Sequence, residues 1–146
     1  PPEAILSREL YRDGYLVAGP PGSLPDAPAI PLDAYCAADH ILVAPGGDLL
    51  GIVDSLLAAQ GRSRRVVLSL SAFLPALAAS ATTGALVTLP ARVASTFARG
   101  FGLVTANPPL AIRPYPVSAF WHRRNAAQPE LAWLRDQLAG VVAGLA

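Results

Sequence analysis

The sequence predicts an α/β fold, and three observations lead to it. Short apolar runs alternate along the chain with helix-like segments, and these runs are almost continuously apolar rather than apolar at alternate positions. Their spacing is about that of a β-α-β unit. Continuously apolar strands are typical of a parallel sheet covered by helices on both faces. We therefore expect a small three-layer unit between Ile41 and Thr105.

Four strands are expected in this unit, at Ile41–Ala44, Val66–Leu70, Ala85–Leu89 and Phe101–Thr105. A helix follows each of the first three. The first carries Ile52, Leu56 and Ala59 on one face and ends at Gly61. Ser71 is expected to cap the second helix, and Pro90 to open the third.

The flanks follow other patterns. Leu10–Ala18 and Val117–Trp121 are strand-like, and residues 20–31 are rich in turn formers. The chain ends in an amphipathic helix that opens at Pro129. Its apolar stripe, at a period near 3.6, consists of Leu131, Leu134, Leu138, Val141 or Val142, and Leu145.

Composition limits the possible functions. A chain of 146 residues with 53% hydrophobic residues forms a real core and is not intrinsically disordered. A formal charge of +1 argues against a stand-alone nucleic-acid binder. One cysteine excludes an internal disulfide and fits a reducing compartment. Because the chain opens at Pro1 without Met, we interpret it as part of a longer polypeptide or a processed product.

The longest uncharged run, Val66–Ala91, has the length of a membrane span. It contains two prolines and several hydroxyl residues, and it divides into three apolar pieces. This pattern favours strand, helix and strand over a membrane helix.

Catalytic motifs are absent from the sequence: G-x-S-x-G, Walker A and G-x-G-x-x-G do not occur. Cys36, Asp39 and His40 lie close together and could form a nucleophile or a metal-site fragment, although Cys36 beside two alanines is more typical of a small packing residue. The arginines at 62, 64 and 65 could bind phosphate, but a solvated loop is the simpler interpretation. We expect no metal, no cofactor and no enzymatic activity.

The strand ends offer a binding site instead. In open α/β sheets, ligands bind beyond the carboxyl ends of the strands, where helix N-termini present free N–H groups. Three such ends occur, at Ala44–Asp48, Ser71–Phe73 and Thr88–Pro90. Their amides, hydroxyls and one aromatic ring suit a small-molecule pocket. The alternative is that Ser71 only caps a helix and Phe73 only fills the core.

An ordered set of segments carries a family resemblance. Leu10-Tyr-Arg-Asp-Gly-Tyr-Leu-Val is followed by Leu32-Asp-Ala-Tyr, taken as a strand, and then by His40-Ile-Leu-Val-Ala-Pro-Gly-Gly-Asp. Ser71-Ala-Phe, Gly84-Ala-Leu-Val-Thr-Leu-Pro and Pro116-Val-Ser-Ala-Phe-Trp-His come later in the same order, before the helix with Trp133-Leu134. Together they resemble the effector-binding domain of LysR-type transcriptional regulators, with most similarity to the nodulation-regulator-like branch.

The resemblance implies a periplasmic-binding-protein-like (type 2) fold of two α/β subdomains. Residues 1–19 would then hold the first crossing strand and its flank. Residues 20–116 would form the second subdomain, and residues 117–146 the second crossing strand and a helix returning to the first subdomain. A DNA-binding winged helix-turn-helix and most of the first subdomain would lie outside this chain.

The resemblance also implies an effector in the cleft between subdomains, with one wall supplied by Pro45, Gly46, Ser71, Ala72, Phe73, Thr88 and Leu89. Gly46 stands where this branch often has a basic residue, and Gly84 where it often has Asp. An aromatic or weakly polar effector is therefore expected. The regulator would be a cytoplasmic homodimer or homotetramer that reaches DNA through its missing domain and has no membrane partner. The alternatives are a solute-binding protein of a transport system, or a small α/β enzyme using Cys36 and His40.

Overall fold

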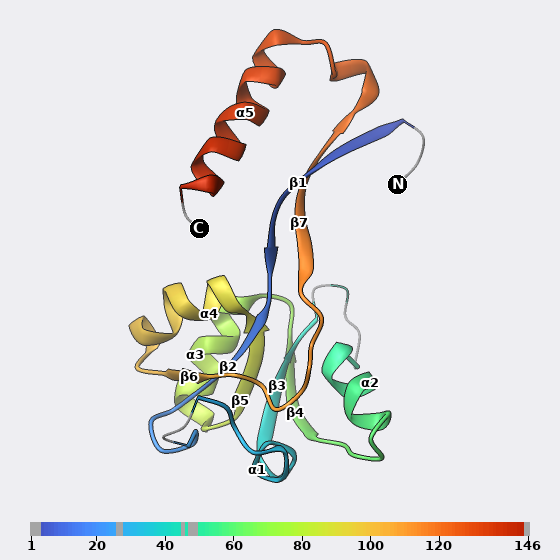
Figure 1. Ribbon diagram of the computed structural model, residues 1–146. Coiled ribbons are helices and arrows are strands. Elements are labelled where there is room, and N and C mark those ends of the chain that lie inside the picture. Colours follow the sequence, from blue (N-terminus) through green and yellow to red (C-terminus); the bar gives the residue numbers. More distant parts are fainter. Residues whose placement is uncertain (1–3, 26–27, 45, 47–49, 145–146) are drawn as a thin grey trace. The chain divides into compact units, whose positions relative to one another are not determined.

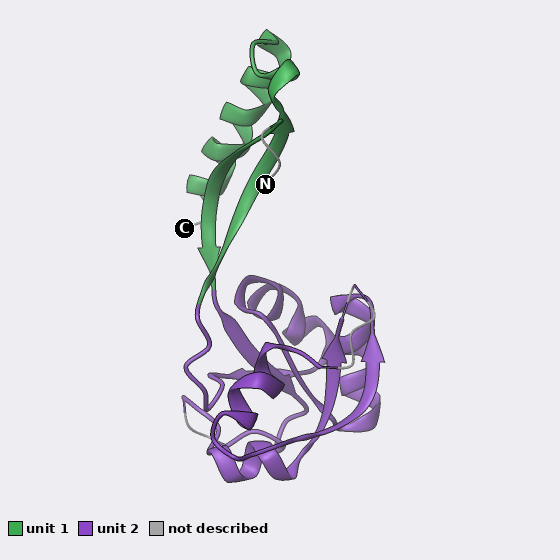
Figure 2. Cartoon of the chain, turned by 90° about the vertical axis from the view of Figure 1, so that its right-hand side faces the viewer, with its two compact units in different colours: residues 1–13, 114–146 green, residues 14–113 purple. Residues whose placement is uncertain are grey.

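The computed structural model describes residues 4–25, 28–44, 46 and 50–144. The chain divides into two compact units, residues 1–13 with 114–146, and residues 14–113 (Figure 2). No helix in the described ranges is long and apolar enough to cross a bilayer. The uncharged run at 66–91 instead forms a strand, a helix and a second strand.

The larger unit contains a five-stranded sheet in the order β4-β3-β5-β2-β6. Its strands are β2 (Tyr15–Gly19), β3 (Asp39–Val43), β4 (Arg65–Leu70), β5 (Leu86–Pro90) and β6 (Val104–Ala106). Its helices are α1 (Leu32–Ala37), α2 (Ile52–Ala58), α3 (Phe73–Thr83), α4 (Ala91–Phe97) and a short 3₁₀ helix, η1 (Ala98–Phe101). The predicted rhythm of strand and helix is thus present, and α1 and η1 are added to the three expected helices.

Two apolar clusters, one on each face, hold the three layers together. Residues of α3, α4 and η1 pack with Ile41, Val87 and Leu89 on one face, and residues of α1 and α2 pack with Val17 and Leu86 on the other (Figure 1). Alternate residues of β5 therefore point to opposite faces, as the two-residue period of a strand requires.

Several local predictions need correction. The sheet is mixed: β3, β4 and β5 are parallel, whereas β2 runs antiparallel to both β5 and β6. Leu32–Tyr35 belongs to a helix, because Pro31 provides its extended N-cap and Asp33 lies in its first turn. The face of α2 that is buried carries Val53 and Leu57, while Ile52 is 47% exposed.

Two further differences concern the edge and the start of the sheet. Val67 and Leu68 of β4, expected to be buried, are 50% and 37% exposed because β4 is an edge strand. The strand expected at Leu10–Ala18 is divided at Gly14 into the end of β1 (Ile5–Asp13) and the whole of β2. β2 lies in the sheet of the larger unit, although it falls within the predicted 1–19 segment.

The smaller unit consists of a two-stranded antiparallel ribbon and the last helix. β1 pairs with β7 (Tyr115–His122) from Ile5 opposite His122 to Asp13 opposite Tyr115, with an irregularity between Glu9 and Tyr11. A short 3₁₀ helix, η2 (Arg123–Asn125), leads to α5 (Pro129–Ala143), which begins with a proline as predicted.

Helix α5 is attached to the ribbon by polar and aromatic contacts. Arg8 of β1 bonds Asp136 at 3.1 Å, and the Arg135 guanidinium lies 4.6 Å from the centre of the Trp121 ring. The stripe residues Leu134, Leu138 and Val141 are 46%, 43% and 63% exposed. Most of the predicted apolar face of α5 is therefore left uncovered within its own unit.

Candidate functional site

A backbone hydrogen bond joins the carboxyl ends of β3 and β4, at the edge of the sheet where the sequence predicts a binding site. The Ala44 N–H donates to the Leu70 carbonyl at 2.8 Å, so that Ala44, directly after β3, lies beside the last residue of β4. At the end of β5, the Ala91 N–H donates to the carbonyl of Gly14 at 3.0 Å. The tips of the three parallel strands thus share one edge of the sheet, as expected for this topology.

The seven predicted wall residues differ in their exposure. Gly46, Ser71 and Ala72 are exposed. Phe73 is half-buried against the apolar cluster that α3, α4 and η1 form with one face of the sheet, called here the α3–α4 cluster. Leu89 is only 1% exposed and belongs to that same cluster. Pro45 lies outside the described residues. The side chains available at this edge are therefore those of Ser71, Ala72 and Phe73.

Thr88 points away from the α3–α4 face. Its Oγ1 lies 2.6 Å from the hydroxyl oxygen of Tyr35, a residue of the cluster on the α1–α2 face. The Thr88 hydroxyl already has a protein partner, and the side chain is half-buried.

Helix α3 begins at the edge with an uncompensated positive end. Its N-cap is Ala72 rather than Ser71, and no side chain caps it. The backbone N–H groups of Ala72, Phe73 and Leu74 therefore have no acceptor within the helix. The first turn carries no acidic residue. Such an end favours an electronegative group of a ligand.

Gly84, where the resemblance leads one to expect Asp, has a structural explanation. It is the C-cap of α3 with φ of +80°, in the left-handed region that glycine adopts at little cost. The residue is thus suited to ending α3.

Arg64 lies at the centre of a polar cluster that the sequence did not reveal. Its guanidinium donates to both carboxylate oxygens of Asp54, at 2.8 and 2.9 Å, and to the Tyr35 hydroxyl at 3.2 Å. Asp54 also accepts the Gly51 N–H at 2.7 Å. The side chains of Arg64 and Asp54 are 2% and 13% exposed. The ion pair therefore joins α2 to the loop before β4, and the hydrogen bond to the Tyr35 hydroxyl adds α1 to the cluster.

The surroundings of this cluster shift the pKa values of its members. Burial raises the pKa of Tyr35 in spite of the opposing Arg64 charge. For Asp54, burial acts to raise the pKa, but the hydrogen bonds from Arg64 and the Gly51 N–H outweigh it and hold the pKa below its usual value. The ion pair is therefore charged near neutral pH.

His40 is fully buried on β3 and has a structural role. Its Nε2 donates to the Tyr35 carbonyl at 2.7 Å, and its ring centre lies 4.4 Å from that of Tyr35. Burial lowers the pKa of His40 to about 4, so the ring is neutral. Cys36 is half-buried. In the part of the chain that the structure describes, no three His, Cys, Asp or Glu side chains are grouped to hold a metal ion.

The three neighbouring arginines all have carboxylate partners. Arg62 pairs with Asp33, Arg64 with Asp54, and Arg65 with Asp39. The interpretation as a solvated loop fits Arg62 and Arg65, whose side chains are 38% and 71% exposed, but not the buried Arg64.

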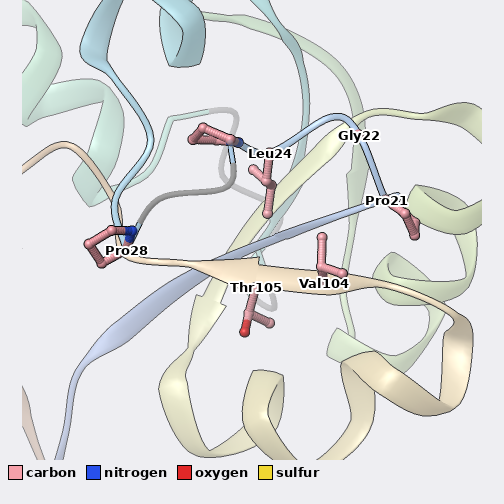
Figure 3. A pocket seen from close by; sticks show the side chains of 7 residues that line it. Pro21, Gly22, Leu24, Pro28, Val104 and Thr105 are labelled. Carbon is pink, nitrogen blue, oxygen red and sulfur yellow. The ribbon is translucent and has the colours of Figure 1, made fainter.

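Two of the hollows on the larger unit are lined by described residues. One, of about 620 Å³, lies beside β6 and is lined by Pro21, Gly22, Leu24, Pro25, Pro28, Val104 and Thr105 (Figure 3). The other, of about 320 Å³, lies between α2 and the loop before β4 and is lined by Leu50, Asp54, Ser55, Ala58, Arg62, Ser63 and Arg64. Neither includes a described member of the predicted wall.

Comparisons with known proteins agree with the resemblance. The family described as LysR substrate binding domain matches residues 1–143. The chain is 34% identical over 140 residues to the HTH-type transcriptional regulator LinR of Sphingobium indicum and 31% identical over 139 residues to SyrM of Rhizobium meliloti. Each alignment covers 94% of this chain, but only 46% of LinR and 43% of SyrM. The chain thus spans less than half the length of these relatives.

A solved structure supports the same assignment. The regulatory domain of MexT, a transcriptional activator in Pseudomonas aeruginosa, is 30% identical, with a TM-score of 0.79. The match covers 94% of this chain and 66% of that one. The mixed sheet, the terminal helix and the family match lead to one conclusion: this chain belongs to the LysR substrate-binding domain family.

Proposed function

We propose that this chain is the effector-binding portion of a LysR-type transcriptional regulator and that an effector binds at the carboxyl edge of β3 and β4. The single observation that carries the proposal is the junction of Ala44 with Leu70, which brings Gly46 and the uncapped start of α3 to one edge. Family membership and the transcriptional regulators among the relatives support it.

Each residue of the edge has a proposed role. The Ser71 hydroxyl and the N–H groups at the start of α3 bind a polar group of the effector. The Phe73 ring packs against its apolar body. Leu89 and Thr88 support this wall from inside the unit, because one is buried in the core and the other bonds Tyr35. Pro45, between Ala44 and Gly46, is proposed to contact the effector as well.

A strong fixed charge is missing from the described part of this edge. Gly46 contributes no side chain, and Ser71, Ala72 and Phe73 are uncharged. An aromatic or weakly polar effector therefore suits the site better than a highly charged one.

The proposed division into subdomains involves parts of the regulator that lie outside this chain. Residues 1–19 and 117–146 hold the crossing strands and a helix that packs on a first subdomain. Residues 20–116 form the second subdomain, whose sheet β2 of the first segment joins. The exposed Leu134, Leu138 and Val141 support this division, since contiguous exposed apolar surface marks an interaction site. Binding of the effector between the subdomains changes the quaternary state of a cytoplasmic homodimer or homotetramer. A separate winged helix-turn-helix contacts the DNA.

The experiment is a thermal-shift screen of the full-length gene product with a panel of aromatic acids and phenols. We expect at least one compound to raise the melting temperature and to change operator binding. Replacement of Phe73 by Ala should abolish both effects, whereas Phe97→Ala, at an exposed phenylalanine of α4, should abolish neither. If no compound acts, or if both variants respond like the wild type, the proposal is wrong.

A further inference from the structure

The hollow between α2 and the loop before β4 is separate from the proposed effector edge. Arg62, Ser63 and Arg64 precede β4, whereas Ser71 follows its other end. A strand of six residues spans about 20 Å. A ligand held by Arg62 could therefore not contact Ser71 unless it were itself of that length.

The lining of this hollow is cationic. It contains two arginines and one carboxylate, Asp54, and that carboxylate is engaged by Arg64. The second arginine, Arg62, is 38% exposed and pairs with Asp33, which does not line the hollow. Arg62 is thus the more exposed of the two arginines that line the hollow.

The pair between Arg62 and Asp33 is open to competition. The Asp33 side chain is 87% exposed, so it keeps most of its contact with water. Ion pairs at such exposed positions are weak, because water and salt compete with both partners. An anion in the hollow can replace Asp33 at the guanidinium without leaving a buried charge unpaired.

The rest of the lining offers two more kinds of contact. Ser55 and Ser63 are exposed and carry hydroxyl donors, and Leu50 and Ala58 provide apolar surface. A volume of about 320 Å³ is at the lower end of the range for ligand pockets, which favours a small molecule.

We propose that this hollow is a second ligand site, for a small organic monoanion. Its carboxylate pairs with Arg62 and accepts hydrogen bonds from Ser55 or Ser63, and its short aliphatic tail lies against Leu50 and Ala58. The site is distinct from the effector edge and does not depend on the function proposed there.

The test uses hexanoate as the probe and its neutral counterpart hexanamide as the control, with isothermal titration calorimetry on the full-length gene product. We expect saturable binding of hexanoate and affinity for hexanamide about tenfold lower, since a hydrogen bond to a charged group is worth roughly a factor of ten or more. Equal affinity for the two probes, or no saturation, overturns the proposal.

Three variants sharpen the result. Arg62→Gln should weaken hexanoate binding about tenfold. Asp33→Asn should strengthen it, because the competing carboxylate is removed. Arg65→Gln removes the same charge at a residue that is 71% exposed and does not line the hollow, and it should leave binding unchanged. All three positions are on the surface, and unchanged urea midpoints verify that the fold is intact.

Other results of these experiments would contradict the proposal. Weaker binding by Asp33→Asn, or an equal loss in Arg62→Gln and Arg65→Gln, would mean that general surface charge attracts the probe. If inorganic phosphate competes as strongly as hexanoate, the aliphatic tail has no site and the proposal fails. Phe73→Ala should not alter hexanoate binding, which separates this site from the proposed effector edge.

Discussion

Arg64 and Asp54 form a two-pronged ion pair in the interior of the larger unit, with Nε–Oδ1 and Nη2–Oδ2 distances of 2.8 and 2.9 Å. The two residues are ten positions apart, and neither belongs to an apolar motif. Their pairing fixes the start of α2 against the loop before β4, because Asp54 also accepts the Gly51 N–H.

Removing one partner of this pair should be costly. Arg64→Leu leaves the Asp54 carboxylate, only 13% exposed, without its counter-charge. The expected loss is about 3–5 kcal/mol in the free energy of unfolding, measured by urea denaturation. Arg65→Gln is the control: its own side chain is 71% exposed and that of its partner Asp39 is 40% exposed, so the change should cost less than about 1 kcal/mol. Equal losses would contradict the buried role of Arg64.

The contact between Tyr35 and Thr88 should be energetically coupled. Tyr35→Phe removes a hydroxyl that lies 2.6 Å from Thr88 and accepts from Arg64. We expect a loss of about 1–3 kcal/mol, as for other buried hydrogen-bond partners left unsatisfied. A double-mutant cycle with Thr88→Val should give an interaction energy above about 0.5 kcal/mol. If the losses in unfolding free energy of the two single variants simply add in the double variant, the contact between the two hydroxyls contributes nothing to stability.

Acid should destabilise the larger unit through His40. Burial lowers its folded-state pKa to about 4, below the unfolded value of 6.5, so the unfolded chain binds more protons between these values. Stability is therefore complete above pH 6.5 and falls as the pH decreases towards 4, by about 3 kcal/mol in total. Asp54 also makes the fold less stable in acid, but at lower pH than His40. Its folded-state pKa lies below the unfolded value of 3.8, so its contribution to stability is lost as the pH falls below 3.8.

The measurement is a series of urea unfolding curves from pH 4 to 7. In His40→Gln the slope over this window should largely disappear, whereas His122→Gln, at the end of β7, should keep it. A wild-type stability that is flat over the window would contradict a neutral buried imidazole.

The exposed stripe of α5 should behave differently in the isolated chain and in the full-length gene product. Leu138→Glu changes a side chain that is 43% exposed here, so the chain should lose less than about 1 kcal/mol. In the full-length protein the same change should cost about 2–3 kcal/mol, because a buried leucine would become a buried carboxylate. Gln137→Glu, at an exposed polar position, should be neutral in both. Equal small losses in both proteins would show that the stripe is not an internal interface.

The layered α/β core could be predicted from the sequence, because strands that are apolar almost throughout are usually buried on both faces of a sheet. Ile41, from one such run, and Val87 and Leu89, from another, all lie in the core. The sequence was not sufficient for the position of β2, since strand order and direction depend on contacts between Val17 or Ala18 and residues some 70 to 90 positions away. The exposed face of β4 was missed for the same reason, because periodicity does not identify an edge strand.

The candidate site was predictable only in part. The strand-end rule located Gly46, Ser71 and Phe73 at one edge, since it follows from topology alone. It did not show that Leu89 is core or that the Thr88 hydroxyl bonds Tyr35, because side-chain direction depends on the register of β5. No local sequence pattern marks the Arg64–Asp54–Tyr35 cluster, because its members are separated by ten to twenty-nine positions and meet only in the folded unit.

The most direct test of the account is amide hydrogen exchange on the full-length gene product, with and without a compound that passes the thermal-shift screen. The proposal predicts slower exchange at Gly46 and at the first-turn amides of Ala72, Phe73 and Leu74 when the compound is bound. Slower exchange confined to other segments, with these four amides unchanged, would contradict the claim that the joined ends of β3 and β4 hold the effector.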